Sequence, residues 1–178
     1  PRWADNALLR AVDLGETTVT LTWAPALDNL SVARYRLLLN DRVAAETEAL
    51  SIQLDGLAPL TTYQAELVAI DGAGNPSSVA NPRLEFTTID STAPEFAEGA
   101  TLILHDPTPR QVEVSWQAAI DNVEVAGYEL SLDGGQLGRV DAETRRYTIS
   151  GLRAGTRVTA MVRAFDSSEN LSAAGPSV

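Results

Sequence analysis

Thr18-Val19-Thr20-Leu21-Thr22-Trp23 alternates polar and apolar residues, and Val112-Glu113-Val114-Ser115-Trp116 repeats this alternation and ends in a tryptophan 93 residues after the first. A period of two places one side of a β-strand in a core and the other side in water. The two stretches therefore predict two half-buried strands, each of which ends in a buried tryptophan. We expect Trp23 to pack beside Tyr35, and Trp116 beside Tyr128.

The spacing between the two tryptophans is part of an internal repeat that covers nearly the whole chain. Asp28-Asn29 recurs as Asp121-Asn122 at an offset of 93 residues. Further along the offset is 95, so that Asp71 corresponds to Asp166. Two residues have therefore been inserted in the second copy, and the sequence predicts that they lie in a turn near Asp133-Gly134-Gly135, since insertions are tolerated in loops.

The repeat predicts two domains, residues 1–90 and residues 91–178, joined at Asp90-Ser91-Thr92-Ala93-Pro94. A unit of ~90 residues has a suitable size for one small domain. Short alternating runs separated by Gly, Pro, Asn and Asp predict an antiparallel sandwich of seven strands in each unit. In the first unit the expected strands lie near residues 7–12, 17–24, 32–40, 42–46, 50–55, 62–71 and 83–88.

The composition excludes several classes of function. The chain has 178 residues, with 13 basic and 24 acidic side chains and a formal net charge of −11, which argues against nucleic-acid binding. All 13 basic residues are arginine, so lysine chemistry is excluded, and the lack of cysteine removes thiol chemistry. No apolar run approaches the ~18 residues that a membrane span needs. We therefore expect no membrane insertion.

Three motifs together resemble a fibronectin type III domain: Trp23, the run Tyr35-Arg36-Leu37-Leu38-Leu39, and the run Leu57-Ala58-Pro59-Leu60-Thr61-Thr62-Tyr63. Asp28 to Tyr35 and Asp71 to Ser77 resemble the bacterial subfamily in particular. This resemblance implies an all-β fold of two consecutive seven-stranded antiparallel β-sandwiches of the fibronectin type III or immunoglobulin-like kind.

The resemblance also implies a tyrosine corner, in which the hydroxyl of Tyr63 ties the sixth strand to the preceding turn. The second unit departs from it there, because Val158 stands where the first unit has Tyr63. Its end, Gly175-Pro176-Ser177-Val178, matches only the start of the segment that gives the last strand of the first unit. We expect the last strand of the second unit to be short or incomplete.

The bacterial subfamily occurs in secreted glycoside hydrolases and in long surface proteins. The resemblance thus implies a non-catalytic spacer and presentation rod in an extracellular or cell-surface protein, with neighbouring domains of a longer chain as its partners and the fragment itself a monomer. Pro1 aligns with Pro94, which favours a chain cut from a longer array. The alternatives are a protein- or glycan-binding adhesion module and an accessory region of a secreted glycoside hydrolase.

Catalysis is not expected from these residues. His105 is the only histidine, and a strand-end histidine before the turn Asp106-Pro107 is most simply an exposed side chain. Sandwich units of this size lack the deep cleft in which paired carboxylates would act on a glycoside. We therefore expect no catalytic residues and no required cofactor.

A small interaction face is one candidate site in the first unit. If Tyr35 points inward, then the alternating neighbours on the third and sixth strands point outward. The expected patch consists of apolar side chains with two arginines around them: Leu38, Val68, Ile70, Arg34 and Arg36. The simpler interpretation is that these apolar side chains are scattered singly or covered by loops.

A calcium site is the second candidate. In this topology the loop after the second strand, the loop after the sixth strand and the chain entry lie at one end of a unit. In the second unit they bring together acidic and amide side chains: Asp90, Asp121, Asn122, Asp166 and Asn170. In the first unit the corresponding residues are Asp28, Asn29, Asp71 and Asn75. Calcium prefers such oxygen ligands. The alternative is that these residues only form turns by accepting hydrogen bonds from backbone amides.

Overall fold

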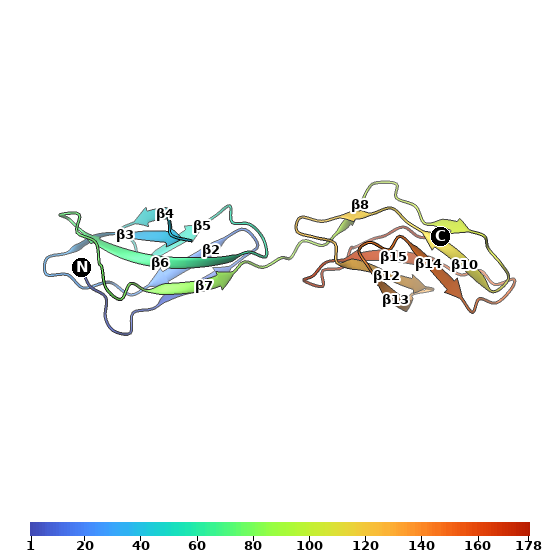
Figure 1. The fold of residues 1–178 in the computed structure, drawn as a ribbon, viewed down its shortest axis with the longest axis horizontal. Helices are drawn as coiled ribbons and strands as arrows, with labels where there is room; N and C mark the ends of the chain where they lie inside the picture. The colour runs from blue at the N-terminus through green and yellow to red at the C-terminus, as the bar shows by residue number, and fades with distance from the viewer. The chain divides into compact units, whose positions relative to one another are not determined.

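The computed structural model describes residues 1–178, which fold as two compact units, Pro1–Asp90 and Ser91–Val178. Both units consist of β-strands joined by turns and loops (Figure 1). No helix of the chain has the length and apolar character that crossing a membrane requires. The repeat in the sequence thus corresponds to two separately packed structures.

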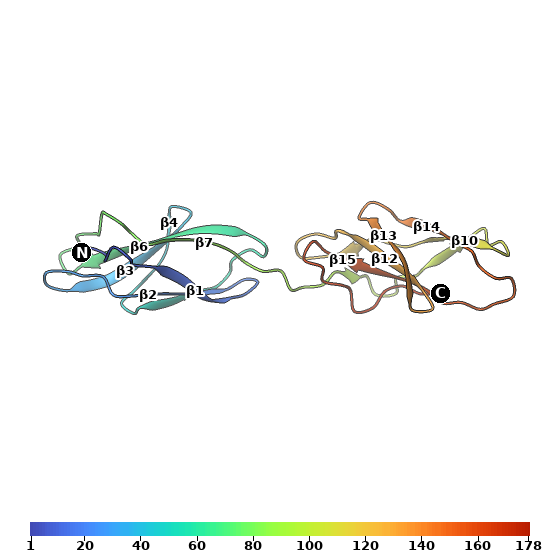
Figure 2. The ribbon, with the colours of Figure 1, turned by 90° about the horizontal axis from the view of Figure 1, so that it is seen from below.

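Unit 1, Pro1–Asp90, is a sandwich of two antiparallel sheets. One sheet has the order β1-β2-β5 and the other β4-β3-β6-β7. Figure 2 shows the strands of the two sheets on opposite sides of this unit. The strands are β1 (Leu9–Leu14), β2 (Val19–Trp23), β3 (Val32–Leu39), β4 (Arg42–Thr47), β5 (Ser51–Leu54), β6 (Thr62–Asp71) and β7 (Arg83–Thr87). Each agrees within about two residues with a strand expected from the sequence.

The core of unit 1 is built around the predicted aromatic pair. Alternate residues of β2 are buried, and the strand ends at Trp23, which is 7% exposed. The Trp23 ring meets the Tyr35 ring edge-on at 5.5 Å between centroids, and the Trp3 ring lies 5.8 Å from Tyr35 on another side. The Tyr35 hydroxyl accepts a hydrogen bond from the backbone N–H of Ala26 at 3.2 Å. The period-two pattern thus identified the core correctly.

Unit 2, Ser91–Val178, repeats this arrangement with shorter strands. Its sheets have the orders β14-β10-β9, β13-β12-β15 and β11-β8. The strands are β8 (Glu95–Phe96), β9 (Ile103–His105), β10 (Gln111–Ser115), β11 (Ala119–Ile120), β12 (Gly127–Leu132), β13 (Gly135–Asp141), β14 (Arg146–Ser150) and β15 (Ala160–Phe165). Trp116 is buried against Tyr128 at 5.6 Å between ring centroids, as predicted.

The expected count of seven strands holds for unit 1 but not for unit 2. Two of the eight strands in unit 2, β8 and β11, are a two-residue pair that was not foreseen. In place of a strand equivalent to β7, the last residues form a single bridge between Met161 and Ser177. The expectation of a short or incomplete last strand is therefore confirmed.

The two-residue insertion lies elsewhere than expected. The turn between β12 and β13 contains two residues, Asp133 and Gly134, just as the turn between β3 and β4 contains Asn40 and Asp41. All four have positive φ, which is typical of a two-residue hairpin turn. The ladders keep the offset of 93 residues through Asp141, whereas Arg145 already corresponds to Leu50 at an offset of 95. The insertion therefore lies in the loop after Asp141, because the tight hairpin turn admits no extra residue without a change of register.

One position of β12 is packed unlike its counterpart in β3. Gly127 corresponds to Arg34, and the ring of Phe165 lies so close to Gly127 that a Cβ there would meet the ring at 2.6 Å and would also collide with the Val140 carbonyl oxygen. The Arg139 guanidinium in turn covers the Phe165 ring at 4.4 Å from its centroid. Unit 2 thus fills with an aromatic ring the space that a side chain of β12 would occupy.

Candidate functional site

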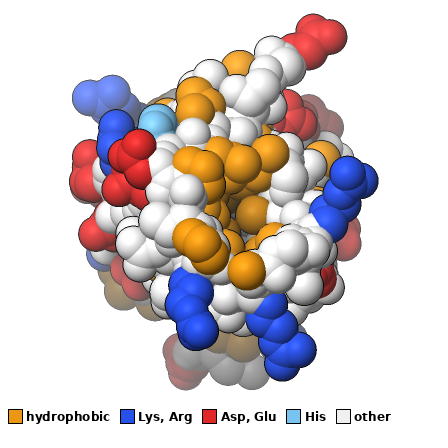
Figure 3. All heavy atoms as spheres, turned by 90° about the vertical axis from the view of Figure 1, so that its right-hand side faces the viewer, with side chains coloured by type: hydrophobic (Ala, Val, Ile, Leu, Met, Phe, Trp, Pro, Cys, Tyr) orange, Lys and Arg blue, Asp and Glu red, His pale blue; other side chains and the backbone are white.

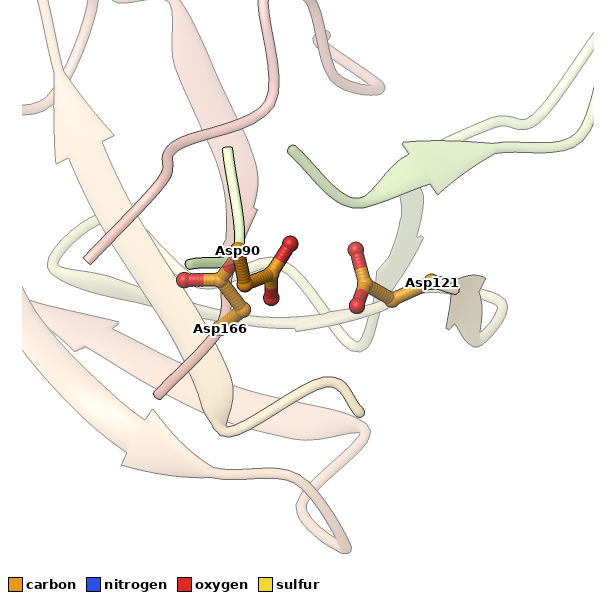
Figure 4. A group of neighbouring side chains, drawn as sticks. All are labelled: Asp90, Asp121 and Asp166. Carbon is orange, nitrogen blue, oxygen red and sulfur yellow. The ribbon is translucent and has the colours of Figure 1, made fainter. Parts of the chain in front are cut away.

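Two of the carboxylates predicted to form a metal site lie together in unit 2. Asp121 directly follows β11 and Asp166 directly follows β15, whereas Asp90 is the last residue of unit 1. One carboxylate oxygen of Asp121 lies within 4.8 Å of one of Asp166, and Figure 4 shows both side chains. Two oxygens bound to one calcium ion at ~2.3–2.6 Å are at most about 5 Å apart. The spacing is therefore compatible with a shared calcium ion.

The Asp121 side chain has two oxygens with different surroundings. Its Oδ1 accepts hydrogen bonds from the backbone N–H groups of Val123 at 2.9 Å and Glu124 at 3.0 Å, which closes the turn after β11. Its Oδ2 is buried and has no hydrogen-bond partner. The turn-forming role that the sequence offered as an alternative thus accounts for one oxygen of Asp121 and leaves the other unexplained.

Asp166 is fully buried at the start of the loop after β15. Its Oδ1 accepts a hydrogen bond from the backbone N–H of Asn170 at 2.7 Å, and its Oδ2 accepts one from the Asn170 side-chain amide at 2.8 Å. These contacts fix the carboxylate in position, and each oxygen keeps a second lone pair for another ligand. Of the predicted amides, Asn170 thus holds Asp166 in place, and Asn122 follows Asp121 in the turn.

Unit 1 has a similar pair of carboxylates at the corresponding turns. Asp28 Oδ1 accepts hydrogen bonds from the N–H groups of Leu30 and Ser31 at 2.9 and 3.1 Å, as Asp121 does at its own turn. Asp28 Oδ2 lies 2.9 Å from the nitrogen of Pro1. The hydrogen bond from Leu30 is the main reason why the pKa of the Asp28 carboxyl is lowered below its ordinary value.

Asp71 is the counterpart of Asp166 and is held in the same way. Its Oδ1 accepts hydrogen bonds from the N–H groups of Ala73 and Asn75, and its Oδ2 accepts one from the Asn75 amide at 2.8 Å. The side-chain hydrogen bond from Asn75 is the main reason why the pKa of Asp71 is lowered. Asn29 follows Asp28 in the turn.

The predicted interaction face of unit 1 requires a correction. Ile70 is only 2% exposed and so belongs to no surface patch, because the chain after β6 folds back and Pro76 forms a bridge with Ile70. Leu38 and Val68 are half-buried. Arg34 and Arg36 both pair with Glu46, at 2.9 and 2.6 Å. The pattern of alternation could not reveal that a loop covers the end of the strand.

An apolar hollow of about 250 Å³ opens at the end of unit 2 that lies opposite the carboxylates along its strands. Figure 3 shows hydrophobic side chains around it and basic side chains farther out. Val158 contributes to its lining where unit 1 has Tyr63. In unit 1, Tyr63 stacks on Phe86 at 5.6 Å, and its hydroxyl accepts a hydrogen bond from the N–H of Ala58 at 2.9 Å. The expected tyrosine corner of unit 1 is thus present.

His105 is half-buried rather than exposed, and its Nε2 lies 2.7 Å from the hydroxyl oxygen of Ser115 on the neighbouring strand. A nucleophilic serine needs a base in this position, and that base in turn needs a third group to orient it. Glu113, which faces His105 in the ladder, pairs instead with Arg146 at 2.6 Å. The contact is therefore a cross-strand pair that joins β9 to β10.

Comparison with known proteins agrees with this architecture. The family model of the fibronectin type III domain matches residues 7–83 and again residues 93–174. Chitinase A1 of Niallia circulans is 32% identical over 173 residues, which is 95% of this chain and 24% of that protein. Exoglucanase A of Cellulomonas fimi is 36% identical over 173 residues, which is 91% of this chain and 19% of that protein.

Among solved structures, a two fibronectin type III domain segment from chicken tenascin aligns over 98% of each chain, with 22% identity and a TM-score of 0.48. The chain spans about a quarter or less of the length of the chitinase and the exoglucanase that it matches. Since the family model covers both units and the two cores repeat the same aromatic arrangement, the chain belongs to the fibronectin type III family and contains two consecutive domains of it.

Proposed function

We propose that the chain is a non-catalytic spacer and accessory module of a longer extracellular protein that degrades a polysaccharide. The observation that carries this proposal is that nearly the whole chain aligns with a minor part of a chitinase and of an exoglucanase. The shared segment is thus the tandem module rather than the greater part of either enzyme. Its partners are the neighbouring domains of the same polypeptide.

The surfaces of the two units fit a spacer better than an enzyme. The outer face of unit 1 carries arginines already paired with Glu46, and unit 2 pairs Arg139 with both Glu129 and Glu169 at 3.1 and 2.6 Å. Exposed ion pairs of this kind add little stability, but they keep the outer face of a sheet polar. Such a surface favours solubility over adhesion.

Deletion of residues 1–178 from the full-length protein tests the proposal. Hydrolysis of a short soluble oligosaccharide should stay within twofold of the parent, whereas hydrolysis of the insoluble polymer should fall several-fold. A matched variant with a flexible Gly-Ser linker of equal length in place of the module tests whether a folded spacer is needed. Loss of activity on the soluble substrate, or unchanged activity on both substrates, would contradict the proposal.

A protein- or glycan-binding module is the alternative function. It requires an exposed apolar or aromatic patch, and the burial of Ile70 removes one member of the patch expected in unit 1. The chain alone should therefore stay in the supernatant when it is mixed with insoluble chitin or cellulose. Saturable binding to either polymer would favour the alternative over the spacer.

A further inference from the structure

Three aspartates of the chain are each followed by a glycine, and the fold surrounds them differently. They are Asp55, Asp71 and Asp133. In such a pair the amide nitrogen of the glycine is able to attack the side-chain carboxyl carbon of the aspartate, because glycine has no side chain and leaves the backbone free to rotate. This reaction requires that the carboxyl group and the peptide after it can move. The contacts of the three carboxyl groups therefore decide which of them reacts.

The carboxylates of Asp71 and Asp133 are both held by backbone N–H groups. Asp71 accepts hydrogen bonds from the N–H groups of Ala73 and Asn75 and from the Asn75 side-chain amide. These bonds, above all the one from the Asn75 side chain, lower the pKa of Asp71 and keep it ionised, a form with no hydroxyl group to leave as water. Asp133 Oδ1 accepts a hydrogen bond from the N–H of Thr159 at 2.8 Å, and the N–H of Asp133 donates to the Thr159 carbonyl oxygen at 2.8 Å.

Asp55 is held less firmly. It lies directly after β5, and both Asp55 and Gly56 are exposed. The hydrogen bond that its carboxylate accepts comes from the exposed side chain of Gln53 at 2.9 Å, and a bond between two exposed side chains competes with water. Gly56 has a φ of +72°, and a Cβ built on it would meet no atom within 4 Å. The carboxyl group and the peptide after it therefore have room to approach each other.

The chain on either side of this pair is anchored. Leu54 pairs with Val19 in the ladder of β5 with β2, and the N–H of Leu57 donates to the Thr17 carbonyl oxygen at 3.0 Å. Leu57 is half-buried and packs against the core of unit 1. A change in the length of the main chain between Leu54 and Leu57 would therefore disturb a segment that is fixed at both ends.

Unit 2 has the same turn without the carboxyl group. Ser150 and Gly151 stand at the corresponding positions, at an offset of 95 residues. Gly151 has a φ of +78°, again with no atom within 4 Å of a Cβ, and the N–H of Leu152 donates to the Arg110 carbonyl oxygen at 3.0 Å. The turn thus forms without an aspartate, and serine is the matched replacement for Asp55.

We propose that Asp55-Gly56 is a site of spontaneous backbone modification, at which the aspartate of the folded chain converts to isoaspartate through a cyclic succinimide. The Gly56 nitrogen bonds to the side-chain carboxyl carbon of Asp55, and the carboxyl hydroxyl leaves as water with the proton of that nitrogen. Water then adds to the main-chain carbonyl carbon of the ring, whose bond to the nitrogen breaks, and the nitrogen regains a proton. The composition of the chain is unchanged, and its backbone now runs through the side chain of residue 55.

The product offers a new group to a modifying enzyme. Isoaspartate carries a free α-carboxyl group and lengthens the main chain by one methylene group. A carboxyl methyltransferase specific for isoaspartyl residues would esterify that carboxyl group, with S-adenosylmethionine as the methyl donor. Asp55 is thus the residue of this chain through which such an enzyme would act on it.

Incubation of the whole chain in water enriched in heavy oxygen, at mildly acidic pH, tests the proposal. Each opening of the succinimide by water adds one heavy oxygen atom, which mass spectrometry of the digested chain detects. In the folded chain we expect the peptide that contains Asp55 to gain this atom several-fold faster than the peptides that contain Asp71 or Asp133. In concentrated guanidinium chloride the three rates should agree within twofold, because the contacts that distinguish the sites are lost.

Two variants and a second readout sharpen the test. Asp55→Ser should gain no heavy oxygen at this position and, once aged, should accept no more methyl groups from the methyltransferase than before ageing, whereas the aged parent accepts up to one per chain at Asp55. Ageing should lower the unfolding midpoint of unit 1 in the parent and leave it unchanged in Asp55→Ser. Asn75→Ala, which removes the side-chain hydrogen bond to Asp71, should raise the rate at Asp71 several-fold and leave that at Asp55 within twofold.

Three outcomes would overturn the proposal, and all three are read from the parent chain, so that none depends on the folding of a variant. Asp55 could gain no heavy oxygen in the folded chain. The three sites could react at equal rates in the folded chain. Asp55 could keep its lead in guanidinium chloride, which would assign the preference to the neighbouring sequence rather than to the fold.

Discussion

Unit 1 and unit 2 have the same core but differ at both of their ends. At one end each unit has an aspartate that closes a turn through its Oδ1, Asp28 in unit 1 and Asp121 in unit 2; the Oδ2 of Asp28 lies 2.9 Å from the nitrogen of Pro1, whereas the Oδ2 of Asp121 is buried without a hydrogen-bond partner. At the other end Tyr63 and Phe86 close the sandwich of unit 1, whereas unit 2 has Val158 and an apolar hollow. The difference teaches that a duplicated sandwich conserves its central aromatic pair while its loops and ends diverge.

The largest expected effect lies in the part that the two units share. Trp23→Ala should lower the free energy of unfolding of unit 1 by ~3–5 kcal/mol, and Trp116→Ala should lower that of unit 2 by the same amount, since either change leaves a large cavity in the core. Scanning calorimetry of the chain and the two variants measures this. Each substitution should move only the transition of the unit that contains it.

An unchanged melting profile for Trp23→Ala would show that the ring is not part of the core. Equal shifts of both transitions by one substitution would show that the units do not fold separately. Because a small domain is stable by only about 5–15 kcal/mol, the predicted loss is large enough to detect without ambiguity.

The central parts of the fold could be predicted because they depend on local patterns. Period-two alternation located the strands of unit 1 and both tryptophans, and the repeat placed Asp121 and Asp166 directly after strands of unit 2. The features that were missed depend on contacts between distant residues. The bridge of Pro76 to Ile70 leaves no trace in the pattern of a single strand.

The misplaced insertion has a different cause. Gly134 and Gly135 stand where a turn is expected, and sequence alone cannot tell a turn that has grown from a tight turn of fixed length. Only the register of β12 with β13 shows that this hairpin retains two residues and that the loop after Asp141 has lengthened. Likewise, the packing of Phe165 over Gly127 was missed because the two residues lie 38 positions apart in the sequence and meet only across the ladder.

Gly127 tests a further difference between the units, which is the packing of the Phe165 ring against β12 in unit 2. Gly127→Ala should destabilise unit 2 by ~1–3 kcal/mol, because the added methyl group meets the Val140 carbonyl oxygen and the Phe165 ring at distances that real contacts do not reach. Gly138→Ala is the matched control, since a Cβ there makes only an ordinary contact of 3.6 Å with Tyr147. Urea unfolding of both variants measures the effect, and equal stability of the two would contradict this packing.

The tyrosine corner is expected to contribute less to the free energy of unfolding than the core tryptophans do. Tyr63→Phe removes the hydrogen bond to the N–H of Ala58 and keeps the ring stacked on Phe86, so unit 1 should lose ~0.5–1.5 kcal/mol. The corresponding change in unit 2 is Val158→Phe. It adds apolar volume at the hollow without removing a hydroxyl group, because residue 158 is a valine. Chemical unfolding of both variants gives the difference, and a loss above about 3 kcal/mol for Tyr63→Phe would mean that the ring also moves.

The smallest effect concerns the dependence of stability on pH. The pKa of Asp71 is lowered in the folded state, chiefly by the side chain of Asn75, so its ionised form favours folding. This contribution is complete above about pH 4, the ordinary range of an aspartate, and is lost as the pH falls through the lower folded-state pKa. The stability difference between the parent and Asp71→Asn should therefore be larger at pH 6 than at pH 2. A difference that does not change with pH would contradict this origin.

A crystal structure of the chain is the most direct test of what the two units share and where they differ. The expected result is the same contact between tryptophan and tyrosine in both cores, at 5.5 Å between the rings of Trp23 and Tyr35 and 5.6 Å between those of Trp116 and Tyr128, with the Phe165 ring packed against Gly127 in unit 2. The contradicting result is a structure in which either tryptophan points into solvent or in which the Phe165 ring lies away from Gly127.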